Sequence, residues 1–249
     1  MKTIYFGLLL VSAFFFFTNG EERTLVVKNE ATFFSLALDQ NSPSFKFDKV
    51  ILSQDISISG VSSRPPFGSE LGGCVPFKGT FDGQGHTLNI QMTGESAALF
   101  CGLKDAVVKN LVISSSSLFS GTSESASAIS LNEFGNVTFC SVINRAKVQG
   151  KKSAGAFVAD VVDIGDSLIT VNNCTNEASI TFHGDDTDLF ATGGFIGAIS
   201  NKTKLSINFI QSVSKESLIG QKNNSVGGFV GLASRNTDVK FLFRECSVE

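Results

Sequence analysis

The sequence has no tryptophan, and its single tyrosine is Tyr5. Any exposed aromatic platform that stacks against sugar rings would therefore consist of phenylalanine alone. The two histidines, His86 and His183, have no HExxH or GxSxG sequence around them, which disfavours a zinc protease or a serine hydrolase. We interpret His86 as part of a chain corner and His183 as a turn residue.

Proline is scarce: there are four, and the last is Pro76. Every residue after it can donate its backbone N–H to a sheet, which favours long regular β-structure. The net charge is −3 without a long acidic or basic run, so nothing indicates a nucleic-acid partner or an anionic membrane surface. We expect no nucleic acid among the partners.

The five cysteines form no CxxC pair, which argues against a compact disulfide framework and against a zinc site. Because their number is odd, at least one is unpaired or bonds to another chain. A buried, apolar role is the alternative for Cys140 and Cys174. The pairing stays open, and we expect no metal or other cofactor.

Residues 1–20 have a cation at Lys2, an apolar core and small residues at the end, which is typical of a cleaved secretory signal peptide. An uncleaved anchor is disfavoured because the apolar run is shorter than the ~20 residues of a spanning helix. No later segment is apolar enough to span, so we expect a secreted, extracellular product, with display at the cell surface through a partner as the alternative. Candidate glycosylation sites follow from four sequons, at Asn136, Asn173, Asn201 and Asn223.

A phrase with one large apolar residue among small ones recurs five times: AALFCGL, SAISL, GAFVAD, GGFIGAIS and GGFVGLAS. Alternating segments such as KLSINFI lie between the phrases and have the period of two that strands show. Three strand-length pieces per repeat predict an all-β fold, a right-handed, single-stranded parallel β-helix. We expect one inward column made of the residues Phe100, Ile129, Phe157, Phe195 and Phe229.

The chain divides into three parts under this prediction: the signal peptide, an N-terminal cap with the first strands at 21–75, and the repeats at 76–249. A helix over 30–38, with Asn29 as N-cap, places Phe33 and Phe34 to seal the first coil. The last repeat stops part-way and leaves a sheet edge. Either another chain covers that edge, or the sequence is the N-terminal piece of a longer protein.

The stretch FKGTFDGQGHTLNI, 77–90, contains three glycines. A dinucleotide-binding loop would need a third small residue where Leu88 stands, and a helix after it, whereas TLNIQM is typical of a strand. We therefore predict a tight structural turn formed by Asp82, Gly83 and Gly85.

PPFGSELGGCVPFKGTFDGQGHTLNI, followed by ALFCGL and VVKNLVIS, resembles the first part of secreted right-handed β-helix proteins with GLUG-type repeats. The resemblance covers about residues 47–249 and implies extracellular display, as in adhesins, rather than a given reaction. Two features depart from the pattern. Cys101 replaces an aliphatic residue, and the repeat over 127–132 lacks glycines, which puts the regularity of the middle coils in question.

Parallel β-helices also include polysaccharide lyases and hydrolases, which need paired carboxylates or a calcium cluster. The candidate carboxylates are in two predicted turns: Asp160, Asp163, Asp166, Asp185, Asp186 and Asp188. No basic residue recurs at their register, so we expect solvated turns and no catalytic residue. The leading hypothesis is a non-catalytic protein for adhesion or surface interaction, with an unidentified surface or glycan partner. The alternatives are a polysaccharide lyase or glycoside hydrolase, and a fragment of a larger surface protein.

Overall fold

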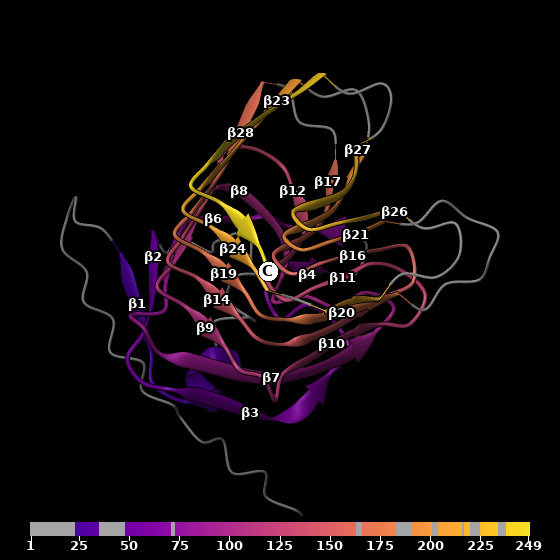
Figure 1. Cartoon of the computed structure of the whole chain (residues 1–249). Helices are drawn as coiled ribbons and strands as arrows, with labels where there is room; N and C mark the ends of the chain where they lie inside the picture. The colour runs from indigo at the N-terminus through magenta and orange to yellow at the C-terminus, as the bar shows by residue number, and fades with distance from the viewer. Residues whose placement is uncertain are drawn as a thin grey trace, which may run out of the picture.

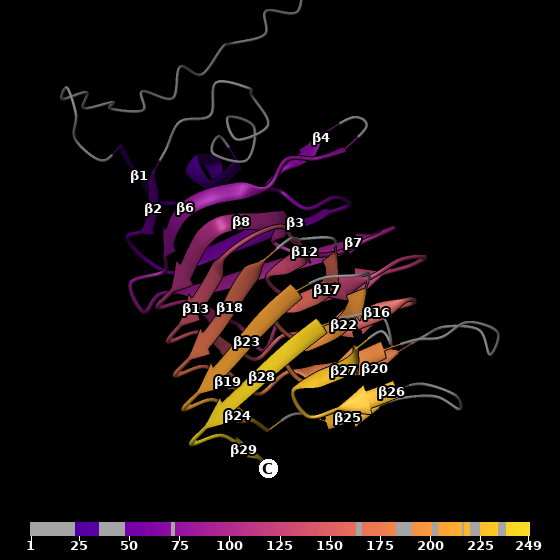
Figure 2. The same ribbon diagram turned by 90° about the horizontal axis from the view of Figure 1, so that it is seen from above.

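The computed structural model describes residues 23–34, 48–70, 73–162, 166–182, 191–200, 204–215, 217–219, 225–233 and 238–249. Their fold is a parallel β-helix, in which the chain winds in coils and each strand pairs with its counterpart in the next coil. Figure 2 shows the coils stacked in chain order, with the C-terminus at the end opposite the first strands. The expected signal peptide, 1–20, lies outside the described residues.

Among the described residues sheet A is the largest sheet, with 12 strands. Its strand β8 (Phe100–Lys109) pairs with two later strands, one along each half of its length, so the sheet divides into two branches. Branch A1 contains β12 (Ser130–Glu133), β17 (Val158–Val162), β22 (Ile196–Ser200) and β27 (Val230–Ala233). Branch A2 contains β13 (Val137–Cys140), β18 (Ser167–Asn172), β23 (Lys204–Ile210) and β28 (Asp238–Arg244). The first strands of the sheet are β1 (Thr24–Val27), β2 (Lys49–Leu52) and β6 (Phe77–Asp82).

Sheet B divides in the same way at β7 (Thr87–Gly94), which also pairs with β3 (Ile56–Ser62). Branch B1 contains β9 (Val112–Ile113), β14 (Ile143–Asn144), β19 (Thr175–Asn176), β24 (Val213–Ser214) and β29 (Ser247–Val248). Branch B2 contains β10 (Leu118–Gly121), β15 (Lys147–Gly150), β20 (Ser179–Phe182) and β25 (Ser217–Ile219).

Sheet D is the third parallel sheet, with four strands: β11 (Ala126–Ser127), β16 (Ser153–Gly155), β21 (Ala191–Gly193) and β26 (Ser225–Gly227). The small sheet C is an antiparallel pair, β4 (Ser69–Glu70) and β5 (Gly73–Cys74). A full coil, seen end-on in Figure 1, runs through sheet D, A1, A2, B1 and B2. Each coil therefore has five strands on three sheets, where the sequence predicted three strand-length pieces.

The extra strands come from corners that the alternation of apolar residues does not reveal. Between A2 and B1 each coil has one residue with a left-handed backbone, at φ values from 49° to 55°: Asn110, Ser141, Asn173, Gln211 and Glu245. Such a residue redirects the chain without a long loop, so the two strands on either side read as one segment in the sequence.

The interior is a stack of apolar side chains, and phenylalanine rings dominate it. Phe157, Phe195 and Phe229 stack on one another, with ring centroids 4.8 Å and 5.2 Å apart. Ile129 lies one coil earlier and is fully buried. Burying one such side chain contributes about 1.5–3 kcal/mol, so stacking several coils is what offsets the entropy of ordering the chain.

Phe100 is buried but out of the predicted alignment. The strand register places Phe100 opposite Ser130, whereas the alignment of the repeated phrases places it opposite Ile129. The reason is a shorter corner. Ala97 pairs with Ala126, and Phe100 pairs with Ser130. Phe100 is three residues after Ala97, whereas Ser130 is four residues after Ala126. The predicted column therefore shifts by one residue at its first member.

The N-terminal end has a short helix over 30–34. Asn29 caps it, because its side-chain Oδ1 accepts a hydrogen bond from the Thr32 N–H at 2.9 Å. Phe33 is buried and packs edge-on against Phe67, which stacks on Phe100 at 4.9 Å. Phe34, also expected to seal the coil, is 38% exposed. The expected continuation of the helix to residue 38 lies outside the described residues.

Candidate functional site

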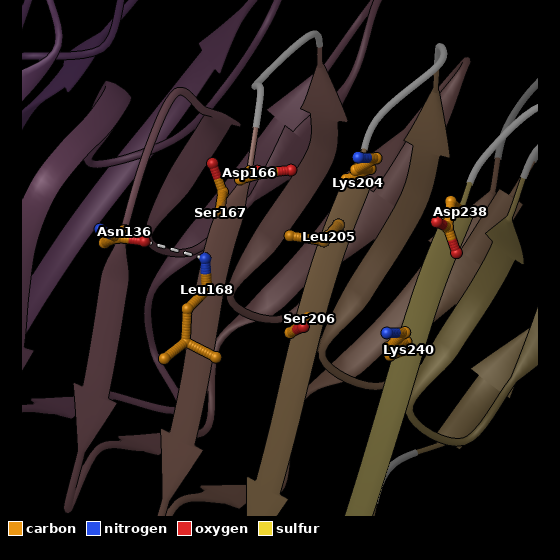
Figure 3. A pocket seen from close by; sticks show the side chains of 9 residues that line it. All are labelled: Asn136, Asp166, Ser167, Leu168, Lys204, Leu205, Ser206, Asp238 and Lys240. Atoms are coloured by element: carbon orange, nitrogen blue, oxygen red, sulfur yellow. Dashed lines mark hydrogen bonds between the residues drawn. The ribbon is translucent and has the colours of Figure 1, made fainter.

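Two grooves open on the outer surface of sheet A. The first, which we call the A2 groove, has a volume of about 380 Å³ and lies at the beginnings of β18, β23 and β28. Figure 3 shows Asn136 accepting a hydrogen bond from the Leu168 N–H, at 2.9 Å. The charged side chains around it have both signs, since Lys204 and Lys240 lie near Asp238. The groove therefore has no charge of a single sign that would select an ionic partner.

The second groove, which we call the A1–D groove, also has a volume of about 380 Å³. It lies between sheet D with its adjoining turns and the outer face of branch A1, and it crosses several coils. Its polar lining residues are Ser96, Glu124, Ser125, Asn132, Lys152, Ser153, Asp160 and Ser200. Hydroxyl, amide and charged groups thus share one concave surface.

Asp160 is the central acidic residue of this groove. The Ser200 hydroxyl lies 2.9 Å from each of its carboxylate oxygens. Burial raises the pKa of Asp160 to about 6, although hydrogen bonds from Ser200 and the Val161 backbone oppose this shift. The carboxyl group therefore changes its charge in the mildly acidic range.

The opposite wall of the groove is held by contacts between coils. Lys152 pairs with Glu124 at 2.6 Å, and the Ser153 hydroxyl donates to Ser125 at 2.7 Å. The Lys152–Glu124 pair is half-exposed, so it contributes little to stability. Its effect is to fix the position of one cation and one anion at the rim.

Of the six carboxylates predicted from the sequence, the two that the structure describes lie in different grooves. Asp160 lines the A1–D groove, whereas Asp166 lines the A2 groove. The other four candidates, Asp163, Asp185, Asp186 and Asp188, lie outside the described residues, as does His183. Within the described residues no group of three or more His, Cys, Asp or Glu side chains could hold a metal ion.

Asp82, Gly83 and Gly85 form the turn between β6 and β7. The Asp82 carboxylate accepts hydrogen bonds from the Gln84 N–H and from the Asn110 side chain, both at 3.0 Å. Burial opposes ionisation, but these bonds and nearby Lys109 outweigh it and lower the pKa of Asp82.

The turn requires glycine at these two positions for different physical reasons. Gly85 has a φ of +82°, which favours glycine. A Cβ on Gly83 would lie 2.5 Å from the Asn110 carbonyl oxygen, so any larger residue at this position would clash with the backbone of the neighbouring coil. His86 follows, and its Nδ1 lies 3.4 Å from Asp55. These residues hold a corner between coils and line neither groove.

Two of the four sequon asparagines lie in the described residues, and both are exposed. Asn136 borders the A2 groove, and Asn173 stands at a left-handed corner, where its side-chain nitrogen donates to the Ser141 hydroxyl at 3.2 Å. Asn201 and Asn223 lie outside the described residues.

Two of the five cysteines form a disulfide, Cys74–Cys101, which joins the segment before β6 to strand β8. The thiols of Cys140, Cys174 and Cys246 are free. Cys174 is fully buried, and burial raises the pKa of its thiol to about 12. It therefore acts as a small apolar residue of the core.

Most of the A1–D groove has no signal in the sequence. Ser200 meets Asp160 across 40 positions, and Lys152 meets Glu124 across 28. These contacts depend on the register between coils of unequal length, and no local motif encodes them. Comparison with protein-family models, with curated proteins and with solved structures gave no match, so the GLUG-type resemblance has no family match behind it.

Proposed function

We propose that the protein is a secreted, non-catalytic β-helix that binds an extracellular partner through the A1–D groove, and that adhesion or surface interaction is its role. Kinship with the GLUG-type β-helix proteins, which the sequence resembles, is part of this proposal. The disulfide is compatible with an oxidising compartment. Within the described residues no helix has the length and apolarity to cross a bilayer.

The observation that carries the proposal is the lining of the groove. Asn132, Asp160 and Ser200 offer donors and acceptors along one wall, while Lys152 and Glu124 do so at the rim. Sugar hydroxyl groups need this mixture of donors and acceptors. A neutral or weakly charged glycan is therefore the partner class that the groove fits best.

The test is binding of the purified protein to a panel of immobilised glycans and to extracellular matrix. We expect Asn132→Ala and Ser200→Ala to weaken binding by about tenfold each, which is the effect of losing a hydrogen bond of about 1.4 kcal/mol. Asp166→Ala and Ser206→Ala, in the A2 groove, are the matched controls. Equal effects of both sets of variants, or no binding by the wild type, would contradict the proposal.

One observation favours a second candidate, a glycoside hydrolase or polysaccharide lyase. Asp160 has a pKa of about 6, which suits a general acid near neutral pH. Such an enzyme needs a second group, and the other carboxylate among the described lining residues is Glu124, which pairs with Lys152. Cleavage of acidic and neutral glycans, lost in Asp160→Asn and in Glu124→Gln, would support this candidate. Absence of cleavage across the panel would retire it.

A further inference from the structure

The A1–D groove runs along the axis of the β-helix, because each of its walls takes residues from successive coils. On the sheet D side the lining residues share one register column: Ser96, Ser125, Ser153 and Ala191. On the branch A1 side they share another: Asn132, Asp160, Ala198 and Leu232. Neighbouring coils are about 4.8 Å apart. An elongated partner therefore fits the groove when its long axis is parallel to the axis of the β-helix.

The N-terminal end of the groove is closed. Gly102 precedes Asn132 in the A1 column, one coil earlier, and residues of one column share a face of the sheet. A Cβ on Gly102 would contact the Phe134 ring and lie 3.2 Å from the Sγ atom of Cys74. The ring and the sulfur atom therefore fill the space that would continue the groove toward the first coils.

The sulfur atom belongs to a hairpin that is fastened to β8. Sheet C forms this hairpin, and the Cys74–Cys101 disulfide joins its second strand to β8. The Cys101 N–H also donates to the Phe67 carbonyl at 2.7 Å, just before the hairpin. Figure 1 shows β4 in line with the strands of sheet D, and Figure 2 shows it on their N-terminal side. The closure of the groove is therefore anchored covalently.

Polar groups at the closed end are suited to the last sugar of a chain. The Asn132 side-chain nitrogen donates to the Cys101 carbonyl at 3.4 Å, which leaves its Oδ1 atom as an acceptor. The Ser96 hydroxyl lies in the opposite wall. A terminal sugar has a free hydroxyl group where an internal sugar has a glycosidic bond. An internal sugar would need room for the next residue, and the Phe134 ring and Cys74 occupy that room.

We propose that the A1–D groove binds the end of a linear glycan, with the terminal sugar against Asn132 and the chain continuing along the axis past Asp160. Asp160 is two coils from Gly102, about 10 Å along the axis, so it contacts the chain behind the terminal sugar. This inference rests on the proposed function and adds which part of the glycan is recognised.

Capped glycans test the inference on the wild-type protein. The probes are linear gluco-, manno- and galacto-oligosaccharides, each uncapped, capped by a bulky acetal at the non-reducing end, or tagged at the reducing end. For a glycan that binds, we expect one of the two modifications to weaken binding by at least about tenfold and the other to leave it unchanged. A cyclic glucan, which has no end, should not bind. Equal binding of all forms would overturn end recognition and leave the proposed glycan binding in place. Absence of binding by every linear form would contradict the proposed function itself.

Release of the hairpin gives a second readout. Cys74→Ser combined with Cys101→Ser removes the covalent anchor, so the variant should bind the disfavoured capped glycan more tightly than the wild type does, with little change for the uncapped one. Cys140→Ser, which removes a free thiol outside the groove, is the matched control. Circular dichroism checks that both variants are folded. A folded double variant that still rejects the capped glycan would overturn the role of the hairpin, and the capped glycans decide on the wild type alone if that variant does not fold.

Discussion

Glu133 places a carboxyl group in the interior of the β-helix. It is fully buried, between Leu103 and Val161 of the adjacent coils. The Ser130 hydroxyl, which could donate to it, donates to the Asn132 carbonyl at 2.8 Å. Burial raises the pKa of Glu133 well above its ordinary value, because the interior disfavours the charged carboxylate.

Replacing this carboxyl group with an apolar side chain of similar volume should stabilise the fold. We expect Glu133→Met to raise the free energy of unfolding by about 2 kcal/mol, because a buried polar group loses its interactions with water. Urea denaturation measures the change. Glu133→Gln is the matched control and should gain less than the Met variant, since it keeps a polar group of the same size in the interior. A Met variant less stable than the Gln variant would contradict this account.

The pKa of Asp160 predicts how stability depends on pH. Its folded value of about 6 lies above the ordinary value of 3.8, so the folded protein binds the proton more tightly than the unfolded chain does. The free energy of unfolding should therefore fall as the pH rises from about 4 to about 6. Asp160→Asn removes this titration, and its difference from the wild type should grow over that range. Parallel pH profiles of the two proteins would refute the assignment.

Exposure of the sequon asparagines predicts where glycans attach. When the protein is secreted from a host that glycosylates, we expect Asn136→Gln and Asn173→Gln each to reduce the mass by one glycan. Intact mass before and after deglycosylation measures this. Asn89, which is not in a sequon, supplies the control Asn89→Gln. A mass unchanged by either sequon substitution would show that the site is not used.

The corner between sheet D and branch A1 has a glycine in the later coils. A Cβ on Gly155, Gly193 or Gly227 would lie 1.8–2.0 Å from the carbonyl oxygen three residues ahead. In the coil without these glycines, Ser127 stands at the same register, and its hydroxyl donates to the Ser130 carbonyl at 2.6 Å. The missing glycine therefore changes the corner locally and leaves the stacking of the coils intact.

Substitution at this corner should be costly. Gly193→Ala would force a Cβ to within 1.8 Å of the Ile196 carbonyl oxygen, and we expect a loss of about 3 kcal/mol or more of unfolding free energy. Gly60→Ala is the control, because a Cβ there meets nothing within 4 Å. Thermal unfolding of both variants tests the difference. Equal melting temperatures would contradict the steric explanation.

At the level of elements, apolar alternation and the repeated phrases were sufficient to predict a parallel β-helix. They did not reveal the corner at Asn173 or the division of each coil into five strands, because a left-handed residue leaves no gap in an alternating pattern. The misalignment of Phe100 has a related cause. A corner one residue shorter shifts the register without changing the composition.

At the level of the whole molecule, the groove was less predictable than the fold. Asp160 was a candidate from its sequence, but its partner Ser200 belongs to the next coil, and the length of the intervening chain hides the contact. The disulfide was equally hidden, because five cysteines allow several pairings and no spacing favours one of them. Both follow from which residues the stacking places side by side.

The Cys74–Cys101 disulfide has a consequence for how the protein responds to proteolysis. It closes a covalent ring that contains β6 and β7, so one cut inside that ring leaves the two fragments attached. Limited digestion there should yield one band on a denaturing gel, and two after dithiothreitol is added. Separation without the reductant would mean that the bridge is absent. An intact bridge means that a nicked molecule keeps the strands before the cut tethered to the coils that follow.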